Sequence, residues 1–350
     1  MIKVDTTKIK VYRSILSEKS LKKIITKNFA NLNLGIFKVK ILSIGDNDHY
    51  LVYNLSKRYI LRIYRYNKHW LTKEADYLFE IKLLNFLKYS NVKAIYPIAR
   101  DDGSYIGKLM APEGIRYWSL FSYAEGNKVV LDDKNSYLYG KEIAKFHVTT
   151  NKISFNYRKN IDLDFLLESP VRRLNLFFQK NKGVKGIEVL FDSYDKIKGE
   201  IKNFASDLLL DEWGVIGGDF HECNFHKLVT DEVILFDFDL CGYGWRAYDI
   251  AVVYWALFGL YLNNKAKLNF KGSWQNFLRG YQEIRILSEA ELKIIHSFAI
   301  VRQIWFMGSQ ITYKDYIFSD EYWDINLNEL RILYNYASIC DYQDEREILR

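Results

Sequence analysis

The stretch of this 350-residue chain that could carry chemistry reads Ile216-Gly-Gly-Asp-Phe-His-Glu-Cys-Asn224. Asp219 and Asn224 lie five residues apart on an expected loop, and Asp237 follows thirteen residues after Asn224, beyond a short apolar run. Phosphoryl transfer needs a carboxylate near the acceptor hydroxyl and oxygen ligands for the magnesium ion on the triphosphate. A loop-borne Asp with a nearby Asn, together with a second Asp delivered by a hairpin, meets both needs.

The residues before this loop predict a small, sheet-rich part of the chain. Apolar and polar residues alternate over 37–42, 50–53 and 59–64, with turn residues between the runs, so an antiparallel meander of three strands is expected. The other elements expected here are helices around 19–29 and 72–89 and strands near 92–98, 104–109 and 117–123.

The residues after 125–127 predict a larger and mostly helical part. Helices are expected over 137–149, 162–182 (as one or two helices), 189–210 and most of the chain from 247 on, with short strands near 215–216 and 233–236. The predicted fold class is therefore α+β, with a small antiparallel-sheet N-terminal lobe and a mostly helical C-terminal lobe. The predicted boundaries are 1–121 for the first lobe, 122–127 for a hinge and 128–350 for the second lobe.

The motif Asp219-x-His221-x-x-Asn224, followed by Phe236-Asp237-Phe238-Asp239, resembles the catalytic signature of the aminoglycoside phosphotransferase and choline kinase superfamily. The continuation over 242–251 is similar to the segment that enters that family's next helix. Upstream, four segments resemble the family's third strand, the helix with its acidic residue, the hinge and the first large-lobe helix: 61–65, 80–87, 121–126 and 140–147. They occur in the family's order between about 45 and 251, so the resemblance implies a protein-kinase-like, two-lobed fold.

The resemblance also implies a role for each matching residue. Asp219 would accept or orient the proton of the acceptor hydroxyl, and Asn224 and Asp237 would hold magnesium against the nucleotide phosphates. Arg62 would contact the α and β phosphates and pair with Glu80. The expected cofactors are therefore ATP and Mg²⁺.

Further nucleotide contacts are implied on the small lobe and the hinge. The loop over 45–49, including Asn47, would cover the phosphates, although it has no multi-glycine pattern. Backbone groups of Ser122, Tyr123 and Ala124 would bind adenine.

Three residues near the signature have more than one interpretation. His221 would reach the phosphates or brace the loop. Asp239 would help a second metal or the substrate, or serve as a structural hydrogen-bonding group. Asp249 is expected to tie the start of a buried helix to the catalytic loop rather than to take part in chemistry.

Two positions depart from the family's pattern. The family usually has His before the Gly-Asp of the catalytic loop, and this chain has Gly217, which puts the rigidity of the loop in question. The strand cation is Arg62 where many members have Lys, so the geometry of phosphate binding is expected to differ.

Composition narrows the expected partners and compartment. The net charge of +7 arises from 50 Lys and Arg against 43 Asp and Glu spread along the chain, so no nucleic-acid partner is expected. Three Cys without a CxxC pair fit a reducing cytosol, and Cys223 is expected to be a small buried side chain. The N-terminus lacks the apolar core of a signal peptide, and the apolar run 250–262 is too short for a bilayer. A cytoplasmic protein without membrane contact is expected, and its oligomeric state stays open.

The acceptor is not identified by these motifs. The main hypothesis is a small molecule with a hydroxyl group, such as an amino-alcohol or an aminoglycoside-like compound, because twelve residues from Asp237 to Asp249 leave no room for the activation segment of ordinary protein kinases. The alternative is a Ser or Thr of a protein or peptide, since 61–70 is similar to bacterial stress-response kinases of the same superfamily. A catalytically weak nucleotide-binding regulator is a further alternative. By position, 302–305 and 322–324 are candidates for the acceptor pocket, and Trp residues there and at 245 and 255 would line it or pack between helices.

Overall fold

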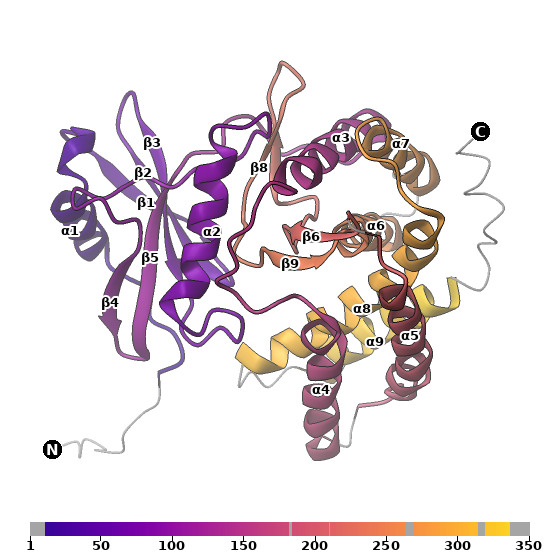
Figure 1. Cartoon of the computed structure of the whole chain (residues 1–350). Helices are drawn as coiled ribbons and strands as arrows, with labels where there is room; N and C mark the ends of the chain where they lie inside the picture. Colours follow the sequence, from indigo (N-terminus) through magenta and orange to yellow (C-terminus); the bar gives the residue numbers. More distant parts are fainter. Residues whose placement is uncertain (1–10, 182–183, 210, 264–268, 314–318, 337–350) are drawn as a thin grey trace, which may run out of the picture. The chain divides into compact units, whose positions relative to one another are not determined.

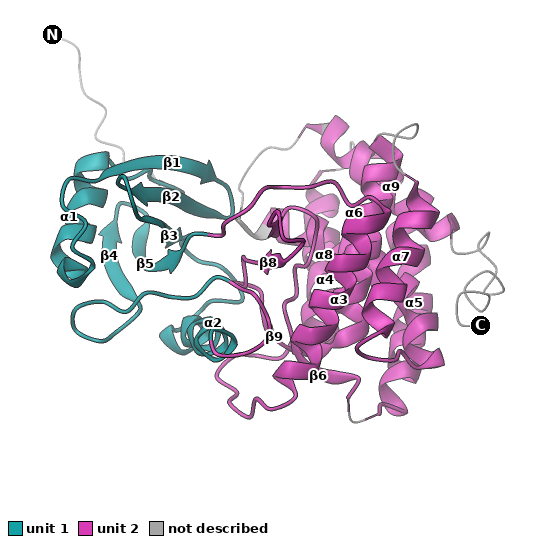
Figure 2. Cartoon of the chain, turned by 90° about the horizontal axis from the view of Figure 1, so that it is seen from above, with its two compact units in different colours: residues 1–88, 95–123 teal, residues 89–94, 124–350 magenta. Residues whose placement is uncertain are grey.

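The computed structural model describes residues 11–181, 184–209, 211–263, 269–313 and 319–336 (Figure 1). Two compact units divide the chain, one made of residues 1–88 and 95–123 and the other of residues 89–94 and 124–350 (Figure 2). The chain thus passes into the second unit after Tyr123, while the exact limits of the predicted lobes and hinge stay a prediction. Cys340 and the first eight residues, which entered the interpretations of disulfides and signal peptides, lie outside the described residues.

The first unit contains an antiparallel sheet and helices, as predicted, and its sheet has five of the six expected strands. The sheet order is β1-β2-β3-β5-β4. Its elements are α1 (Glu18–Asn28), η1 (Ala30–Leu32), β1 (Lys38–Ile44), β2 (Asn47–Tyr53), β3 (Arg58–Tyr64), α2 (Glu74–Leu87), β4 (Gly107–Ala111) and β5 (Gly114–Ser122). Helix α1 begins after Ser17, whose side chain accepts from the N–H of Ser20, and it buries Leu21 and Ile25 in the same apolar cluster as Leu61 of the sheet.

Two local predictions in this unit were wrong. The segment 92–98 forms no strand, only isolated bridges at Ala94 and Pro97, because Pro97 has no N–H to donate and the N–H of Tyr96 bonds to the side chain of Ser122. The turn between β1 and β2 is shorter than the predicted Gly45–Asp48 turn, since β2 already begins at Asn47.

The second unit is mostly helical, also as predicted. Its helices are α3 (Asp133–Thr150), the π-helical turn η2 (Asp164–Glu168), α4 (Ser169–Lys180), α5 (Glu188–Ser206), α6 (Arg246–Asn263), α7 (Phe270–Gln282), α8 (Glu289–Tyr313) and α9 (Asp320–Tyr336). Four short strands complete it: β6 (Trp213–Ile216), β7 (Phe225–Lys227), β8 (Val233–Leu235) and β9 (Gly242–Trp245). Strand β6 pairs with β9, and β7 pairs with β8, in each case antiparallel.

Helix α6 contains the most apolar run of the sequence and forms a buried helix. From Arg246 to Val253 every side chain of α6 is buried. A bilayer-crossing helix is not found among the described residues, because none combines the necessary length with sufficient apolar character. The first turns of α6, which contain Asp249, are therefore held in place by packing around every side chain.

Candidate active site

The catalytic loop between β6 and β7 is anchored by one buried carboxylate. The N–H groups of Gly217 and Gly218 donate to the two oxygens of Asp249 at 2.8 and 2.7 Å. Asp249 is fully buried, and its Oδ2 lies 3.0 Å from Nε2 of His147. Two backbone N–H groups on one carboxylate fix the loop two residues before Asp219, so the predicted tie between the helix and the loop is confirmed.

Burial controls the ionisation of this anchor. Removal from water, helped by the nearby charge of Asp219, raises the pKa of Asp249 to about 7, against the two N–H bonds that favour the carboxylate. Burial, with Arg246 and Arg285, lowers the pKa of His147 well below its usual value, so its ring is neutral. The anchor is thus a hydrogen-bonded pair rather than a fully charged ion pair.

The space beside Gly217 is filled by an aromatic ring. A Cβ atom on Gly217 would lie 2.4 Å from the ring of Phe220. Phe220 is itself buried and packs edge-on against Phe146 and Phe238, with ring centroids 5.3 and 5.8 Å away. The glycine that replaces the family's His therefore makes room for Phe220, and the loop is braced by this ring and by Asp249.

The predicted metal ligands are brought together by the β7–β8 hairpin. Phe225 pairs with Leu235 at its open end, and the N–H of Phe236 donates to the carbonyl of Asn224 at 3.0 Å. Asn224 directly precedes β7 and Asp237 closely follows β8, so the two residues belong to the same end of the hairpin. Carboxylate and amide oxygens are the donors that magnesium prefers, so this pair fits the ion.

The side chains of Asn224 and Asp237 have different constraints. Nδ2 of Asn224 donates to the carbonyl of Asp219 at 2.8 Å, which directs the amide and leaves Oδ1 as its ligand atom. Asp237 has φ of +63°, a left-handed conformation that non-glycine residues rarely adopt and that recurs at functional sites.

Asp219 has a cation on one oxygen and a second cation farther from the other. Nη2 of Arg302, from α8, donates to Oδ1 at 2.5 Å. Nε2 of His221 lies 3.8 Å from Oδ2, beyond hydrogen-bonding distance. Although burial favours a neutral ring, Asp219 and hydrogen bonds with Cys223 and Glu222 raise the pKa of His221 to about 10. His221 is therefore an imidazolium beside Asp219.

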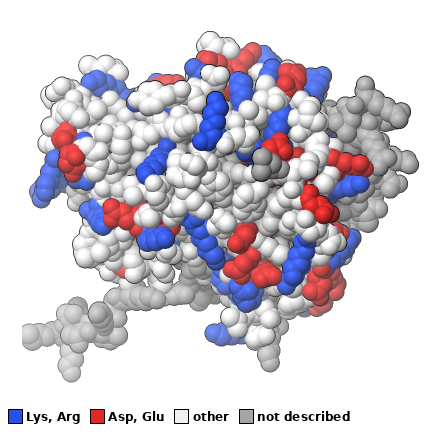
Figure 3. Space-filling view, viewed as in Figure 1, with Lys and Arg blue, Asp and Glu red and all other residues white. Residues whose placement is uncertain are grey.

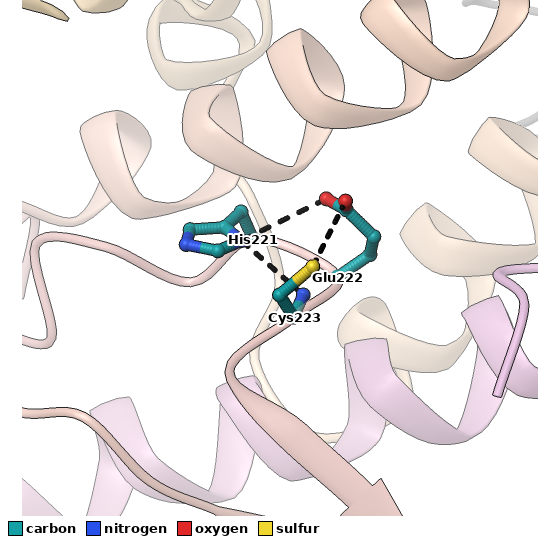
Figure 4. Close-up of side chains that lie close together, drawn as sticks. All are labelled: His221, Glu222 and Cys223. Carbon is teal, nitrogen blue, oxygen red and sulfur yellow. Dashed lines mark hydrogen bonds and ion pairs between the residues drawn. The ribbon is translucent and has the colours of Figure 1, made fainter. Parts of the chain in front are cut away.

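The side chains of His221, Glu222 and Cys223 point toward one another (Figure 4). Nδ1 of His221 lies 3.2 Å from the backbone N of Cys223 and 3.8 Å from Oε2 of Glu222, so the ring lies against its own loop, as the bracing interpretation requires. The donor atoms of the three residues lie within 4.8 Å of one another, a spacing compatible with metal ligands. Cys223 is exposed rather than buried as predicted, and Nζ of Lys128 already donates to its sulfur at 2.9 Å.

In the first unit, the predicted pair of Arg62 and Glu80 is present. Nη1 of Arg62 donates to Oε1 of Glu80 at 2.6 Å, and the hydroxyl of Tyr64 donates to Oε2 at 2.8 Å. Arg62 and Glu80 are both buried. Nε of Arg62 also donates to Nε2 of His49 at 3.2 Å, so the guanidinium is held from more than one direction.

The other predicted nucleotide contacts have partners within the protein. The side chain of Asn47 is buried and accepts from the N–H of Arg65 at 3.4 Å. The N–H of Ser122 donates to the carbonyl of Tyr96 at 2.9 Å. The ring of Tyr123 packs under the guanidinium of Arg58.

Beyond the hinge, the carbonyl of Ala124 pairs with Nδ1 of His226 at 2.9 Å. The carbonyl of Asp239 accepts from Nη1 of Arg158 at 2.8 Å. Two sets of expectations stay predictions: the role of Asp239 at a second metal or the substrate, and the nucleotide contacts of Asn47, Ser122, Tyr123 and Ala124.

A cavity of about 270 Å³ lies next to the catalytic loop, within the second unit. Glu222 of the loop and Glu329 of α9 contribute carboxylates to its wall, and Trp255, Phe258 and Phe306 contribute aromatic rings. Burial raises the pKa of Glu329. For Glu222, burial is outweighed by the hydrogen bond and charge of His221, helped by a hydrogen bond with Cys223, and the pKa is lowered. Glu222 is therefore an anion, and Glu329 would be ionised more easily beside a bound cation.

This cavity was only partly predictable from the sequence. Trp255 was among the candidates, but Trp245 and Trp323 pack against other aromatic rings, Trp323 against Phe177 and Phe178 of α4. Glu222 and Glu329 were not predicted, because nothing in the sequence relates α9 to the catalytic loop. The position of Glu222 within the motif was the one available signal.

Comparison with known proteins places the chain among phosphotransferases. The family model described as "Phosphotransferase enzyme family" matches residues 39–286. An uncharacterized protein of Deinococcus radiodurans is 31% identical over 268 residues, which cover 77% of this chain and 75% of that protein. Both findings agree with the resemblance carried by the catalytic motif.

Two solved structures share the fold. A microcompartment-associated aminopropanol kinase superposes with a TM-score of 0.72 at 18% identity, over 95% of this chain and 99% of that one. An amicoumacin kinase in complex with AMP-PNP, Ca²⁺ and Ami gives a TM-score of 0.69 at 19% identity, over 91% of this chain and 96% of that one. The predicted protein-kinase-like fold is confirmed.

Proposed function

The chain belongs to the phosphotransferase enzyme family and is a phosphotransferase with a hydroxyl acceptor, and we propose that it transfers the γ-phosphoryl group of ATP to a small molecule that also carries an amine. The observation that carries the proposal is the position of the cavity. One wall of it is Glu222, three residues from Asp219, so a molecule bound there lies beside the catalytic loop.

Asp219 is the base in the proposed reaction. Its Oδ1 is occupied by Arg302, so Oδ2 is the oxygen that receives the proton of the acceptor hydroxyl. Asn224 and Asp237 would hold Mg²⁺, which supplies neutralisation of charge on the phosphates when bound. Asp249 keeps the loop in place during this transfer, because its two backbone contacts precede Asp219 by one and two residues.

The nucleotide would be held by Arg62 and by the backbone around Tyr123 and Ala124. Arg62 stays charged and is oriented by Glu80, so it is suited to the α and β phosphates. The N–H of Ser122 is engaged by Tyr96 and the carbonyl of Ala124 by His226, so adenine recognition would rest on the backbone of Tyr123 and the N–H of Ala124. The amicoumacin kinase structure holds AMP-PNP and a divalent cation, which supports the same cofactor class for this chain.

An amine on the acceptor is supported by the chemistry of the cavity. Two carboxylates and three aromatic rings attract a cation and offer little to an anion. The volume of about 270 Å³ lies just below the usual range of about 300–1,000 Å³ for ligand sites, which favours a small amino-alcohol. The aminopropanol kinase acts on an acceptor of this kind, as its name states.

The test is ADP release from ATP and Mg²⁺ with matched acceptors. Aminopropanol and propanediol have nearly the same shape and differ in the amine, and a peptide pool represents the alternative acceptor class. We expect ADP release with amino-alcohols and a rate at least about tenfold lower with the diol. In Asp219→Asn the rate with amino-alcohols should fall at least about 1,000-fold. Release with peptides alone would replace the small-molecule acceptor with a protein. Absence of ADP release with every acceptor, despite nucleotide binding, would favour the regulator.

The cavity itself is tested by Glu329→Gln. This change removes a carboxylate from the wall and leaves the catalytic loop intact. We expect KM for an amino-alcohol to rise about tenfold, with KM for ATP unchanged and the diol unaffected. An equal effect on diol and amino-alcohol would show that Glu329 does not bind the amine.

A further inference from the structure

Arg302 of α8 is the nearest cation to the carboxylate of Asp219. Its Nη2 to Oδ1 distance is 2.5 Å, and its side chain is 4% exposed, against 24% for that of Asp219. Burying a guanidinium costs on the order of several kcal/mol, unless a carboxylate compensates for the lost contacts with water. Asp219 supplies that compensation, so the two side chains are held together.

Two tryptophan rings lie next to this guanidinium. Trp255 of α6 and Trp305 of α8 have their ring centroids 5.0 and 4.9 Å from Cζ of Arg302. Burial opposes the charge of Arg302, but Asp219 and Tyr248 outweigh it and raise the pKa of the guanidinium, which stays protonated. A planar cation that contacts two rings has less freedom to turn, and this restricts the carboxylate bonded to it.

We propose that Arg302 is a positioning residue for phosphoryl transfer, because it holds Oδ1 of Asp219 and thereby turns Oδ2 toward the acceptor hydroxyl. This inference rests on the proposed function of Asp219 as the base. Without Arg302 the carboxylate would rotate about its χ angles, and both oxygens would compete for the cation of His221. Misplacement of a reacting group by about 1 Å costs on the order of 100-fold in rate.

Trp255 links this arrangement to the acceptor cavity. Its ring packs on Arg302 and also lines the cavity, and its Nε1 donates to Oε1 of Gln303 at 2.7 Å. Trp305 supports the same guanidinium but packs on Phe165, with centroids 6.2 Å apart. A change at Trp255 should therefore alter both acceptor binding and turnover, whereas a change at Trp305 should alter turnover alone.

The test separates turnover from binding in four variants. Arg302→Gln should lower kcat about 100-fold, with KM for ATP within about twofold of the wild-type value. Arg302→Lys should recover about tenfold of that loss, because an ammonium supplies the charge but not the planar, forked donors of a guanidinium. Arg173→Gln is the matched control, since Arg173 also contacts α8 but donates to the carbonyl of Gly308. In Arg302→Ala, added guanidinium at sub-denaturing concentration should restore kcat.

Each outcome decides the inference. Acceptor-dependent turnover by the wild type establishes the proposed function before any variant is compared, and its absence would remove that function instead. With turnover established, unchanged kcat in Arg302→Gln would overturn the positioning role. So would a loss that Arg173→Gln matches, or one that neither lysine nor guanidinium reduces, because a general effect on folding gives that pattern.

Discussion

At the scale of single residues, Asp237 combines an unusual backbone with a proposed ligand role. Its φ of +63° is tolerated by Asp and Asn but costs about 1–3 kcal/mol in most other residues. Asp237→Asn therefore keeps the backbone and removes the charge. We expect the Mg²⁺ concentration for half-maximal rate to rise at least about tenfold and kcat to fall about 100-fold.

The measurement is ADP release over a range of Mg²⁺ concentrations, with the midpoint of thermal unfolding as a control. Asp237→Asn should leave that midpoint nearly unchanged, whereas Asp237→Ala should lower it, because Ala disfavours the left-handed conformation. A rate for Asp237→Asn equal to that of the wild type at low Mg²⁺ would remove Asp237 from the metal site.

The buried pair of Arg62 and Glu80 gives a second prediction at this scale. Glu80→Ala leaves the guanidinium buried without its carboxylate, and such broken pairs cost about 3–5 kcal/mol. The double variant Arg62→Met, Glu80→Leu removes both charges and should be less destabilised than Glu80→Ala alone. Urea unfolding measures both. A double variant that is the less stable of the two would mean that the pair itself stabilises the fold.

Most residues of the candidate site could be proposed from the sequence because they lie in short, ordered motifs. Asp219, Asn224 and Asp237 come from two segments whose spacing a single hairpin explains. The contact of Arg302 could not be predicted, since it joins residues 83 positions apart and depends on how α8 packs. The exposure of Cys223 was mispredicted for the same reason, because burial is set by neighbours that are distant in sequence.

At the scale of elements, α3 and α7 approach each other through two glycines. A Cβ on Gly140 would lie 2.2 Å from the carbonyl oxygen of Phe277, and one on Gly280 would lie 2.0 Å from that of Tyr137. Neither carbonyl can move away unless the two helices separate. We expect Gly140→Ala and Gly280→Ala each to lower the free energy of unfolding by about 2–3 kcal/mol or more.

Gly199 of α5 is the matched control for these two glycines. It also lies inside a helix, but a Cβ there meets nothing within 4 Å. Gly199→Ala should stabilise the protein by about 0.5–1 kcal/mol through helix propensity. Chemical denaturation of the three variants measures the contrast. Similar effects at all three positions would mean that the close approach of α3 and α7 does not limit the packing.

Short strands were predicted only where they contain β-branched apolar residues. Strands β6 and β8 contain Val-Ile pairs and were predicted, whereas β7 (Phe-His-Lys) and β9 (Gly-Tyr-Gly-Trp) are as short but contain none and were missed. Helix α3 begins at Asp133, four residues before the predicted start, because Asp132 caps it by accepting from the N–H of Asn135. Such caps are local, and this Asp-Asp pair was available as a signal.

At the scale of the whole molecule, the two-part architecture was predictable because strand-like periodicity before residues 125–127 gives way to mostly helix-like periodicity after them. The distribution of charge over the surface was not, since it depends on which faces the helices turn outward. On the face shown in Figure 3, acidic and basic side chains are interspersed, and the described residues there form no continuous basic area.

The stability of the whole molecule should depend on pH through His296 of α8. Burial lowers the pKa of this ring from 6.5 to about 4, against a hydrogen bond to the backbone of Leu333. In unfolded chains the ring is protonated below about pH 6.5, whereas in the folded protein it stays neutral down to about pH 4. The stability contributed by the neutral ring is therefore complete above pH 6.5 and is lost as the pH falls toward 4, by up to about 3 kcal/mol.

Urea unfolding of the wild type and of His296→Gln, compared between pH 7.5 and about 4.5, measures this contribution, because Gln keeps a donor but cannot titrate. We expect the difference in unfolding free energy between the two proteins to shrink as the pH falls, and a difference independent of pH would show that His296 does not resist protonation in the fold.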